Sequence, residues 1–163
     1  MTSVVRPASA ADASRLLALI CALAEFEQLA PPPEDARQRL LRDAFGPTPR
    51  FHVLLAVSGG EAVGYALFFE TYSTFLARPT LYLEDLFVLP DHRTAGHGAR
   101  LFRAVAAEAV RRGCGRMEWS VLRWNRLAID FYDRLGAAPL DEWQTYRLDG
   151  GALARAGAGT EAA

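Results

Sequence analysis

An apolar, strand-like run that passes through a glycine-rich loop into a helix constrains this chain more than any other feature. The run Thr80–Leu89 is stopped by Pro90, the loop reads Arg93-x-x-Gly96-x-Gly98, and the helix is predicted to continue to about Arg112. Glycines let the backbone approach a ligand closely, and the N–H groups at a helix start carry about half a positive charge. The segment is therefore typical of an anion site, with pyrophosphate as the natural occupant. The simpler alternative is a turn that merely starts a helix, and a P-loop is excluded because no Gly-Lys-Ser/Thr follows.

The other predicted elements alternate between short strands and longer helices. They are a strand at Val4–Arg6, a helix capped by Ser9 or Asp12 and running to about Gln28, a helix at Glu34–Phe45, strands at Phe51–Val57 and Ala62–Thr71 joined by a Ser58-Gly59-Gly60-Glu61 turn, a strand at Arg116–Leu122, a helix capped by Asn125 and ending at Leu135-Gly136, and a strand at Glu142–Leu148. This order predicts an α/β fold with an antiparallel meander at its centre. A Rossmann fold is disfavoured because no glycine-rich turn follows the first strand.

The chain is predicted to form one domain over residues 1–149. Its 163 residues are one domain's worth of protein, long enough to bury a core without disulfides. Residues 150–163 are rich in Gly and Ala and are predicted to form a flexible tail.

The charge balance limits the partners that this chain can have. Eighteen basic residues, all of them Arg, face nineteen acidic residues, for a net charge of −1. Nucleic acid and anionic membranes both favour a basic excess, so neither is expected as the main partner.

Cysteine and histidine usage points to a reducing compartment and away from metal chemistry. Cys21 and Cys114 lie far apart without a CxxC pair, and His52, His92 and His97 form no ligand cluster at metal spacing. The N-terminus lacks a basic start and a small-residue cleavage site, and no run of 18 apolar residues occurs. We therefore expect a cytoplasmic protein without a metal or a membrane span.

The glycine-rich loop resembles the acetyl-CoA loop, [RQ]-x-x-G-x-[GA], of the GNAT superfamily of N-acetyltransferases. Within that superfamily the chain is similar to the diamine (spermidine/spermine-type) and thialysine acetyltransferases. The supporting stretches follow the family's order over roughly residues 4–148: Arg6-Pro7-Ala8, Ala10-Ala11-Asp12, Leu23-Ala24-Glu25-Phe26-Glu27, Tyr82-Leu83-Glu84-Asp85-Leu86-Phe87-Val88, Trp124-Asn125 and Phe131-Tyr132-x-x-Leu135-Gly136-Ala137.

The resemblance implies a fold, a cofactor and an assembly. The expected GNAT fold is a mixed, mostly antiparallel, V-splayed sheet of about six to seven strands flanked by four helices. Acetyl-CoA would be held by backbone groups of Leu86, Phe87 and Val88, by Arg93, by Thr94, Ala95, Gly96, His97, Gly98 and Ala99 around the pyrophosphate, and by Asn125. Relatives pair as homodimers, so a homodimer is expected.

Two residues are the candidates for proton transfer. Alternation along a strand places Tyr82, Glu84, Leu86 and Val88 on one face and Leu83, Asp85 and Phe87 on the other, unless a bulge shifts the register. An amine must lose a proton before it attacks, and the resemblance assigns that acceptor role to Glu84; the alternative is a structural ion pair. It assigns Tyr132 as the general acid toward the thiolate; otherwise Tyr132 packs.

The acceptor is expected to be the primary amine of a small molecule: a polyamine, thialysine or another amino-acid-like amine. Candidate substrate contacts are Phe26, Glu27, Glu84 and Glu142, and direct attack in a ternary complex is favoured because Cys114 has no neighbouring base. Arg123 before Trp-Asn, and Arg78 in a segment without acids, favour an acceptor that carries a carboxylate. The alternatives are a non-catalytic acyl-CoA-binding module and an acetyltransferase acting on a protein amine.

One residue of the loop departs from the family pattern. Thr94 stands where many relatives carry glycine after the loop Arg. Because a β-branched residue adopts positive φ only at a cost, we expect ordinary dihedral angles at Thr94.

Overall fold

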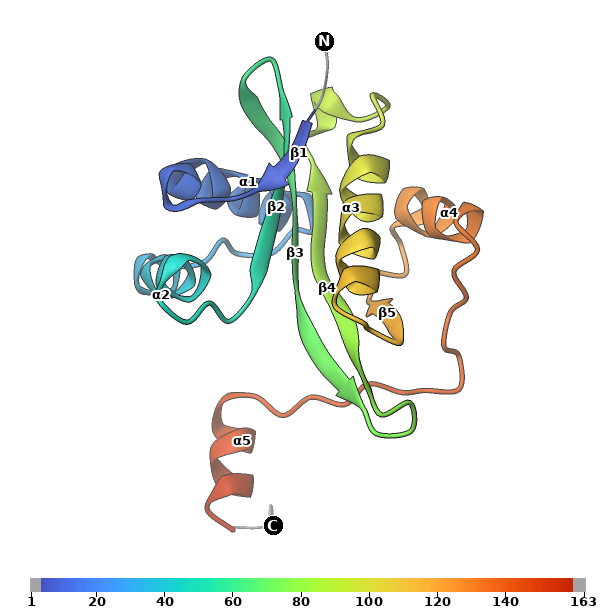
Figure 1. The fold of residues 1–163 in the computed structure, drawn as a ribbon. Helices are drawn as coiled ribbons and strands as arrows, with labels where there is room; N and C mark the ends of the chain where they lie inside the picture. The colour runs from blue at the N-terminus through green and yellow to red at the C-terminus, as the bar shows by residue number, and fades with distance from the viewer. Residues whose placement is uncertain (1–3, 160–163) are drawn as a thin grey trace. The chain divides into compact units, whose positions relative to one another are not determined.

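A five-stranded mixed sheet organises the first of the two units of this chain (Figure 1). The structure is a computed structural model that describes residues 4–159. Residues 160–163 of the predicted tail and residues 1–3 lie outside the described residues. The units are Met1–Ser120 and Val121–Ala163, and they divide within the predicted domain 1–149, which stays a prediction.

The strands follow one another across the sheet in chain order. They are β1 (Val4–Pro7), β2 (His52–Ser58), β3 (Glu61–Ser73), β4 (Arg78–Val88) and β5 (Arg116–Trp119). The pairs from β1 to β4 are antiparallel, and β4 and β5 are parallel. The predicted α/β fold with a central antiparallel meander is confirmed.

The predicted strand count is too high. Among residues 4–159 there are five strands, because the segment Glu142–Leu148 has no regular secondary structure. Its alternation of apolar and polar residues matches a half-buried strand, but Trp143, Tyr146 and Leu148 are exposed. A strand forms when its edge and apolar face find partners, and a periodic sequence alone does not supply them.

Helices cover both faces of the sheet in the first unit. On one face α1 (Ala13–Phe26) buries Leu16 and Leu19 against a cluster that includes Tyr65 and Phe87. On the other face α3 (His97–Arg111) buries Leu101, Val105 and Ala109 against a second cluster. The sheet therefore separates two cores, and α2 (Glu34–Phe45) lies on the side of α1 in Figure 1.

The second unit contains two helices. They are α4 (Arg126–Arg134) and α5 (Gly150–Gly157), the latter inside the predicted flexible tail. The described residues thus hold five α-helices, not the four expected, together with the 3₁₀ turns η1 (Ala10–Asp12) and η2 (Pro90–His92). The glycines of this segment account for the missed helix, since glycine lowers helix propensity.

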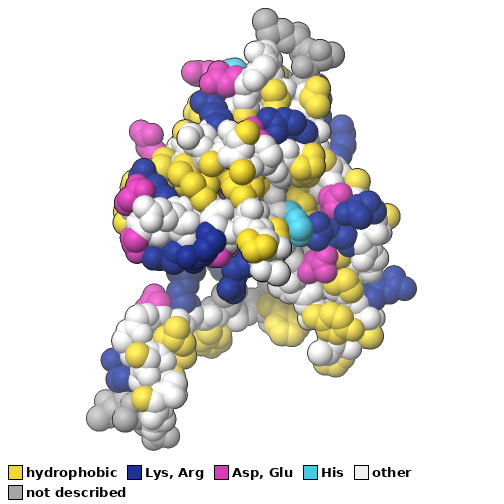
Figure 2. Space-filling view, turned by 60° about the vertical axis from the view of Figure 1, so that its left-hand side comes forward, with side chains coloured by type: hydrophobic (Ala, Val, Ile, Leu, Met, Phe, Trp, Pro, Cys, Tyr) yellow, Lys and Arg dark blue, Asp and Glu magenta, His cyan; other side chains and the backbone are white. Residues whose placement is uncertain are grey.

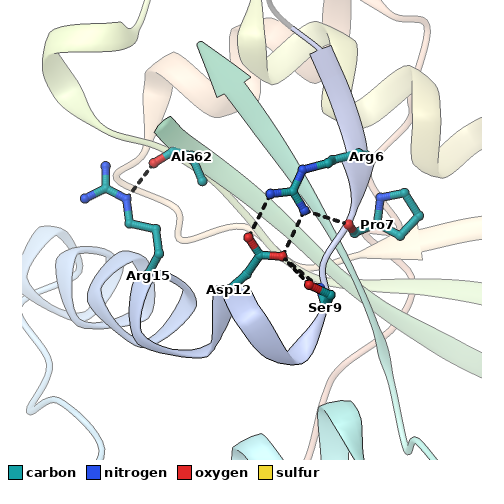
Figure 3. Close-up of polar contacts among 6 residues, drawn as sticks. All are labelled: Arg6, Pro7, Ser9, Asp12, Arg15 and Ala62. Carbon is teal, nitrogen blue, oxygen red and sulfur yellow. Dashed lines mark hydrogen bonds and ion pairs between the residues drawn. The ribbon is translucent and has the colours of Figure 1, made fainter. Parts of the chain in front are cut away.

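A polar network fixes the start of α1 (Figure 3). Asp12 accepts hydrogen bonds from both terminal nitrogens of Arg6, at 2.8 and 2.7 Å, and from the backbone N–H of Ser9 at 2.9 Å. The hydrogen bonds from Arg6 and Ser9 hold the pKa of the Asp12 carboxyl well below its usual range. One turn later Arg15 donates to the carbonyl of Ala62 at 2.7 Å, which ties α1 to β3.

Candidate active site

The last five residues of β4 form an open strand edge. β5 pairs with β4 only from Thr80 to Leu83, so Glu84–Val88 continues beyond its parallel neighbour. The carbonyl of Phe87 faces β3 so closely that a Cβ on Gly64 would lie 2.6 Å from it. Because backbone groups alternate along a strand, those of Leu86 and Val88 face the open edge. This edge can pair with an extended amide-bearing ligand such as the pantetheine arm.

A β-bulge sits at the start of this edge. Leu67 of β3 pairs with Asp85 and Phe68 pairs with Leu83, so the register skips Glu84. Leu81 and Leu83 before the bulge, and Leu86 and Val88 after it, all pack on the α3 face. The bulge that the sequence left open is therefore present, and simple alternation does not continue beyond Leu83. The extra residue keeps leucine on the core face and turns Asp85 to the face of α1.

Asp85 and Tyr65 form a half-buried hydrogen-bonded pair on the α1 face. The Tyr65 hydroxyl donates to the Asp85 carboxylate at 3.0 Å. Burial raises the pKa of Asp85 to about 6, the hydrogen bond from Tyr65 opposes that rise, and the charges of Glu84 and Glu27 add to it. Burial also raises the pKa of Tyr65 above its usual range, followed by the charge of Asp85. The charges of Glu84 and Glu27 thus both act on the carboxyl of Asp85.

The predicted anion loop leads into the start of a helix, as expected. α3 begins at His97, directly after Gly96, whose φ of 78° is in the left-handed region that glycine tolerates. His97 is only 4% exposed, and burial, Arg100 and His92 lower its pKa. A neutral imidazole therefore packs under the loop, and the loop's backbone is what it offers to an anion.

Thr94 contradicts the dihedral angles expected of it. Its φ is 72°, in the region that β-branched residues adopt only with strain. The loop enters from η2 and must reach the N-terminus of α3 within a few residues, and the left-handed turn is taken at Thr94 as well as at Gly96. Such strain is common where a loop is shaped for a ligand.

Arg93 points toward the end of α1 as well as toward β4. Its guanidinium carbon lies 4.5 Å from the centre of the Phe26 ring and 5.6 Å from that of Phe87. Its Nε donates to the carbonyl of Val88 at 2.9 Å. The predicted contact of Arg93 with pyrophosphate stays a prediction.

The predicted substrate contacts that belong to the first unit lie near Phe87, as Arg93 does. Phe26 ends α1, its ring lies 6.3 Å from that of Phe87, and Glu27 follows directly. Glu84 is exposed at the bulge. Residues from α1, β4 and the anion loop therefore converge around Phe87.

The other predicted site residues belong to the second unit. Asn125 caps α4, its side-chain oxygen accepting from the N–H of Ala128 at 3.2 Å, as predicted. Tyr132 lies on α4, where burial raises its pKa to about 12. Glu142 is exposed in the segment without regular structure. Their roles toward cofactor and substrate stay predictions.

Two observations concern metal binding and membrane-spanning helices. Within residues 4–159, no three His, Cys, Asp or Glu side chains gather where they could hold a metal ion, and no helix there combines the length and hydropathy needed to cross a bilayer. On the face drawn in Figure 2, arginine and acidic side chains are interspersed over the first unit, in keeping with the near-neutral net charge.

Comparison with known proteins gives the class to which this site belongs. The model of the acetyltransferase (GNAT) family matches residues 17–137, which is most of the chain and includes the open edge, the anion loop and α4. The chain therefore belongs to the acetyltransferase (GNAT) family, and it is an acetyl-CoA-dependent N-acetyltransferase.

Particular relatives refine the comparison. The chain is 37% identical over 161 residues to a thialysine N-epsilon-acetyltransferase of Bos taurus, covering 92% of this chain and 94% of that one. It is 47% identical over 90 residues to an L-ornithine N5-acetyltransferase of Arabidopsis thaliana, covering 55% and 40% of the two chains. An integron cassette protein from the mobile metagenome of V. cholerae shares the fold, with a TM-score of 0.80 at 22% identity over 96% of this chain and 98% of that one.

Sequence reasoning missed two features of the site. Asp85 was assigned no role because the resemblance gives the proton-acceptor role to Glu84, yet Asp85 is the carboxyl that lies half-buried beside Tyr65 after the bulge. The apolar spacing held a signal for the bulge: Leu81 and Leu83 are two apart, but the next leucine is Leu86. The stack of Arg93 on Phe26 joins residues far apart in the chain and left no local signal.

Proposed function

We propose that this enzyme acetylates the terminal primary amine of an amino-acid-like small molecule by direct attack on acetyl-CoA in a ternary complex. The observation that carries the proposal is that the two acids, the open strand edge and the anion loop follow one another along the chain. The open edge of β4 begins at a bulge with two adjacent acids and is followed, after the short turn η2, by the glycine-rich start of α3. The strand β4 thus offers a proton acceptor and an edge for an amide-bearing arm, and the loop that follows it offers an anion-binding site.

The residues present fit acetyl-CoA. The backbone groups of Leu86 and the N–H group of Val88 are offered at the open edge to the pantetheine arm, while the Val88 carbonyl accepts from Arg93, and residues 94–99 offer backbone N–H groups to the pyrophosphate. A Cβ on Gly98 would lie 3.9 Å from the Val88 side chain, so loop and strand edge are close neighbours. When bound, acetyl-CoA supplies the acetyl group as an activated thioester. Asn125 at the start of α4 completes the proposed set.

The acids at the bulge have a defined task in this proposal. Glu84 is exposed and accepts the proton of the incoming ammonium, directly or through water. Asp85 is largely ionised above pH 6 and, with Glu27, adds negative charge that favours a cationic amine. The Tyr132 phenol is protonated at neutral pH and can donate to the departing sulfur.

The choice of acceptor rests on charge and on the relatives' names. Thialysine and L-ornithine are both amino acids with a terminal amine, so a carboxylate accompanies the reacting group. Arg78 and Arg123 stand where a polyamine site would favour acids, and an arginine can hold a carboxylate. Glu142 and Phe26 remain in the proposed substrate contacts.

A homodimer and a cytoplasmic location belong to the same proposal. Phe75 is 99% exposed at the turn between β3 and β4, and Tyr72 and Leu76 beside it are also exposed. An apolar turn of this kind supports association of two copies.

Release of free thiol from acetyl-CoA across a panel of amines tests the function. We expect release with thialysine or ornithine to exceed that with spermidine and spermine. Glu84→Gln and Tyr132→Phe should each lower kcat roughly 100-fold and leave the KM for acetyl-CoA within about twofold. Glu61→Gln, which removes an exposed acid at the β2–β3 turn, is the matched control and should turn over normally. Tight CoA binding without thiol release from any amine would instead favour the non-catalytic module.

A further inference from the structure

The guanidinium of Arg93 is held by two aromatic rings and a carbonyl at the junction of three elements. Phe26 is the last residue of α1, Phe87 lies in β4, and Arg93 is the first residue after η2. The guanidinium carbon is 4.5 Å from the Phe26 ring centre and 5.6 Å from that of Phe87, and Nε bonds the Val88 carbonyl at 2.9 Å. The entry of the anion loop is thereby fastened to the end of α1.

This arrangement depends on the planar shape of the arginine side chain. A guanidinium can lie flat on an aromatic ring while its edge donates a hydrogen bond, whereas a lysine ammonium is a compact point charge. Burial lowers the pKa of Arg93 from its very high ordinary value, which leaves the group charged at neutral pH. The rings and the carbonyl replace part of the water that the cation loses.

The stack is one end of a continuous path to the buried acid. The Phe26 and Phe87 ring centres are 6.3 Å apart, and those of Phe87 and Tyr65 are 6.5 Å apart. The Tyr65 hydroxyl then donates to Asp85. The same end of α1 carries Glu27, whose charge reaches Asp85 and Tyr65. Arg93 at the entry of the loop, the C-terminal end of α1 and Asp85 are thus linked by one continuous series of contacts.

We propose that Arg93 is a positioning residue for the amine: by stacking on Phe26 it holds the C-terminal end of α1 in register with the open edge of β4. This inference rests on the proposed function, in which Phe26 and Glu27 contact the acceptor. It differs from the role implied by resemblance, in which the charge of Arg93 serves the pyrophosphate. The two roles predict changes in the affinity for different substrates.

Arg93→Lys separates the two roles because it keeps the charge and removes the planar stack. We expect the KM for the amine to rise about three- to tenfold, the fold-change that corresponds to loss of a cation–π contact, while the KM for acetyl-CoA stays within about twofold. Phe26→Leu should produce at least the same shift, because it also removes the proposed contact of Phe26 with the amine, and Phe26→Tyr, which retains an aromatic ring, should keep the wild-type value. The double variant Arg93→Lys/Phe26→Leu should be no worse than Phe26→Leu, because that change already removes the stack.

The chain offers a matched control at a second arginine–phenylalanine stack. The Arg112 guanidinium carbon lies 5.4 Å from the Phe68 ring centre, and Arg112 also pairs with Glu70 and Glu108 at the far end of α3. Arg112→Lys removes a stack of the same kind away from the open edge. It should lower the urea midpoint for unfolding and leave both KM values unchanged.

The outcomes are distinct. A rise in the KM for acetyl-CoA alone in Arg93→Lys would overturn the inference, as would multiplicative effects in the double variant. If wild-type enzyme releases no thiol with any amine, the proposed function fails. The urea midpoints of wild type, Arg93→Lys, Phe26→Leu and the double variant then test the stack by itself. Additive shifts for Arg93→Lys and Phe26→Leu would refute the contact on which the inference depends, and non-additive shifts would support it.

Discussion

The two halves of β4 show how one strand divides its length between stability and chemistry. From Thr80 to Leu83 the strand lies between β3 and β5, and Leu81 and Leu83 are buried in the α3 core. From Glu84 to Val88 it has β3 on one side only, a bulge, a half-buried acid and a direct continuation into a strained loop. Regular pairing supports the sheet, and departures from regularity occur where a ligand has to be met.

The largest difference between the halves should appear in stability. Leu83→Ala removes a side chain that is 2% exposed and packed within the α3 core, so we expect the free energy of unfolding to fall by about 3 kcal/mol. Leu86→Ala, the same change in the open half at a partly buried residue, should cost about half as much. Urea denaturation measures both. Equal losses would mean that the open half is packed as firmly as the closed one.

Several elements of the chain could be predicted from sequence because local signals determine them. The helix Glu34–Phe45 is observed at its predicted bounds, and Asn125 caps α4 as its residue type indicates. The strand ending before Pro90, the glycine-rich loop and the start of α3 also follow from turn chemistry and periodicity. These features depend on neighbours a few residues away.

The open half was less predictable because its features depend on the sheet and on distant residues. The bulge at Glu84 reflects how β4 keeps its leucines on the α3 face against β3. The orientation of Arg93 depends on the end of α1, and the positive φ of Thr94 depends on where η2 and α3 place the ends of the loop. The predicted strand at Glu142–Leu148 did not form for a related reason: its sequence has the period of a strand, but no neighbouring strand among residues 4–159 pairs with it.

The pH dependence of stability tests the acid of the open half. The folded-state pKa of Asp85 is about 6, above its ordinary value of 3.8, so the stability that the neutral carboxyl provides is lost as the pH rises through 6. Asp85→Asn cannot ionise, and its side-chain oxygen can still accept from Tyr65. We expect the variant to be more stable than wild type by about 2 kcal/mol at pH 8, and equal to it near pH 4.

Thermal or urea unfolding between pH 4 and pH 8 measures this difference. Leu86→Ala, which removes no ionisable group from the same open half, is the control, and its stability difference from wild type should stay constant over the same interval. A constant offset between Asp85→Asn and wild type at every pH would show that the buried carboxyl is not titrating near 6.

The smallest expected effect is a change in the free energy of unfolding when backbone strain is relieved at either end of β4. Thr94, just beyond the open end, and Ala77, in the turn before the closed end, both have positive φ, at 72° and 50°. Glycine relieves such strain but gains freedom in the unfolded chain, so the two terms partly cancel. We expect Thr94→Gly to raise the free energy of unfolding by about 1 kcal/mol, and Ala77→Gly by less, because a β-branched side chain is the more strained of the two. If Thr94→Gly is instead destabilising in urea, or gains no more than Ala77→Gly, the loop at the open end is not the more strained, and the contrast between the two halves would rest on packing and charge alone.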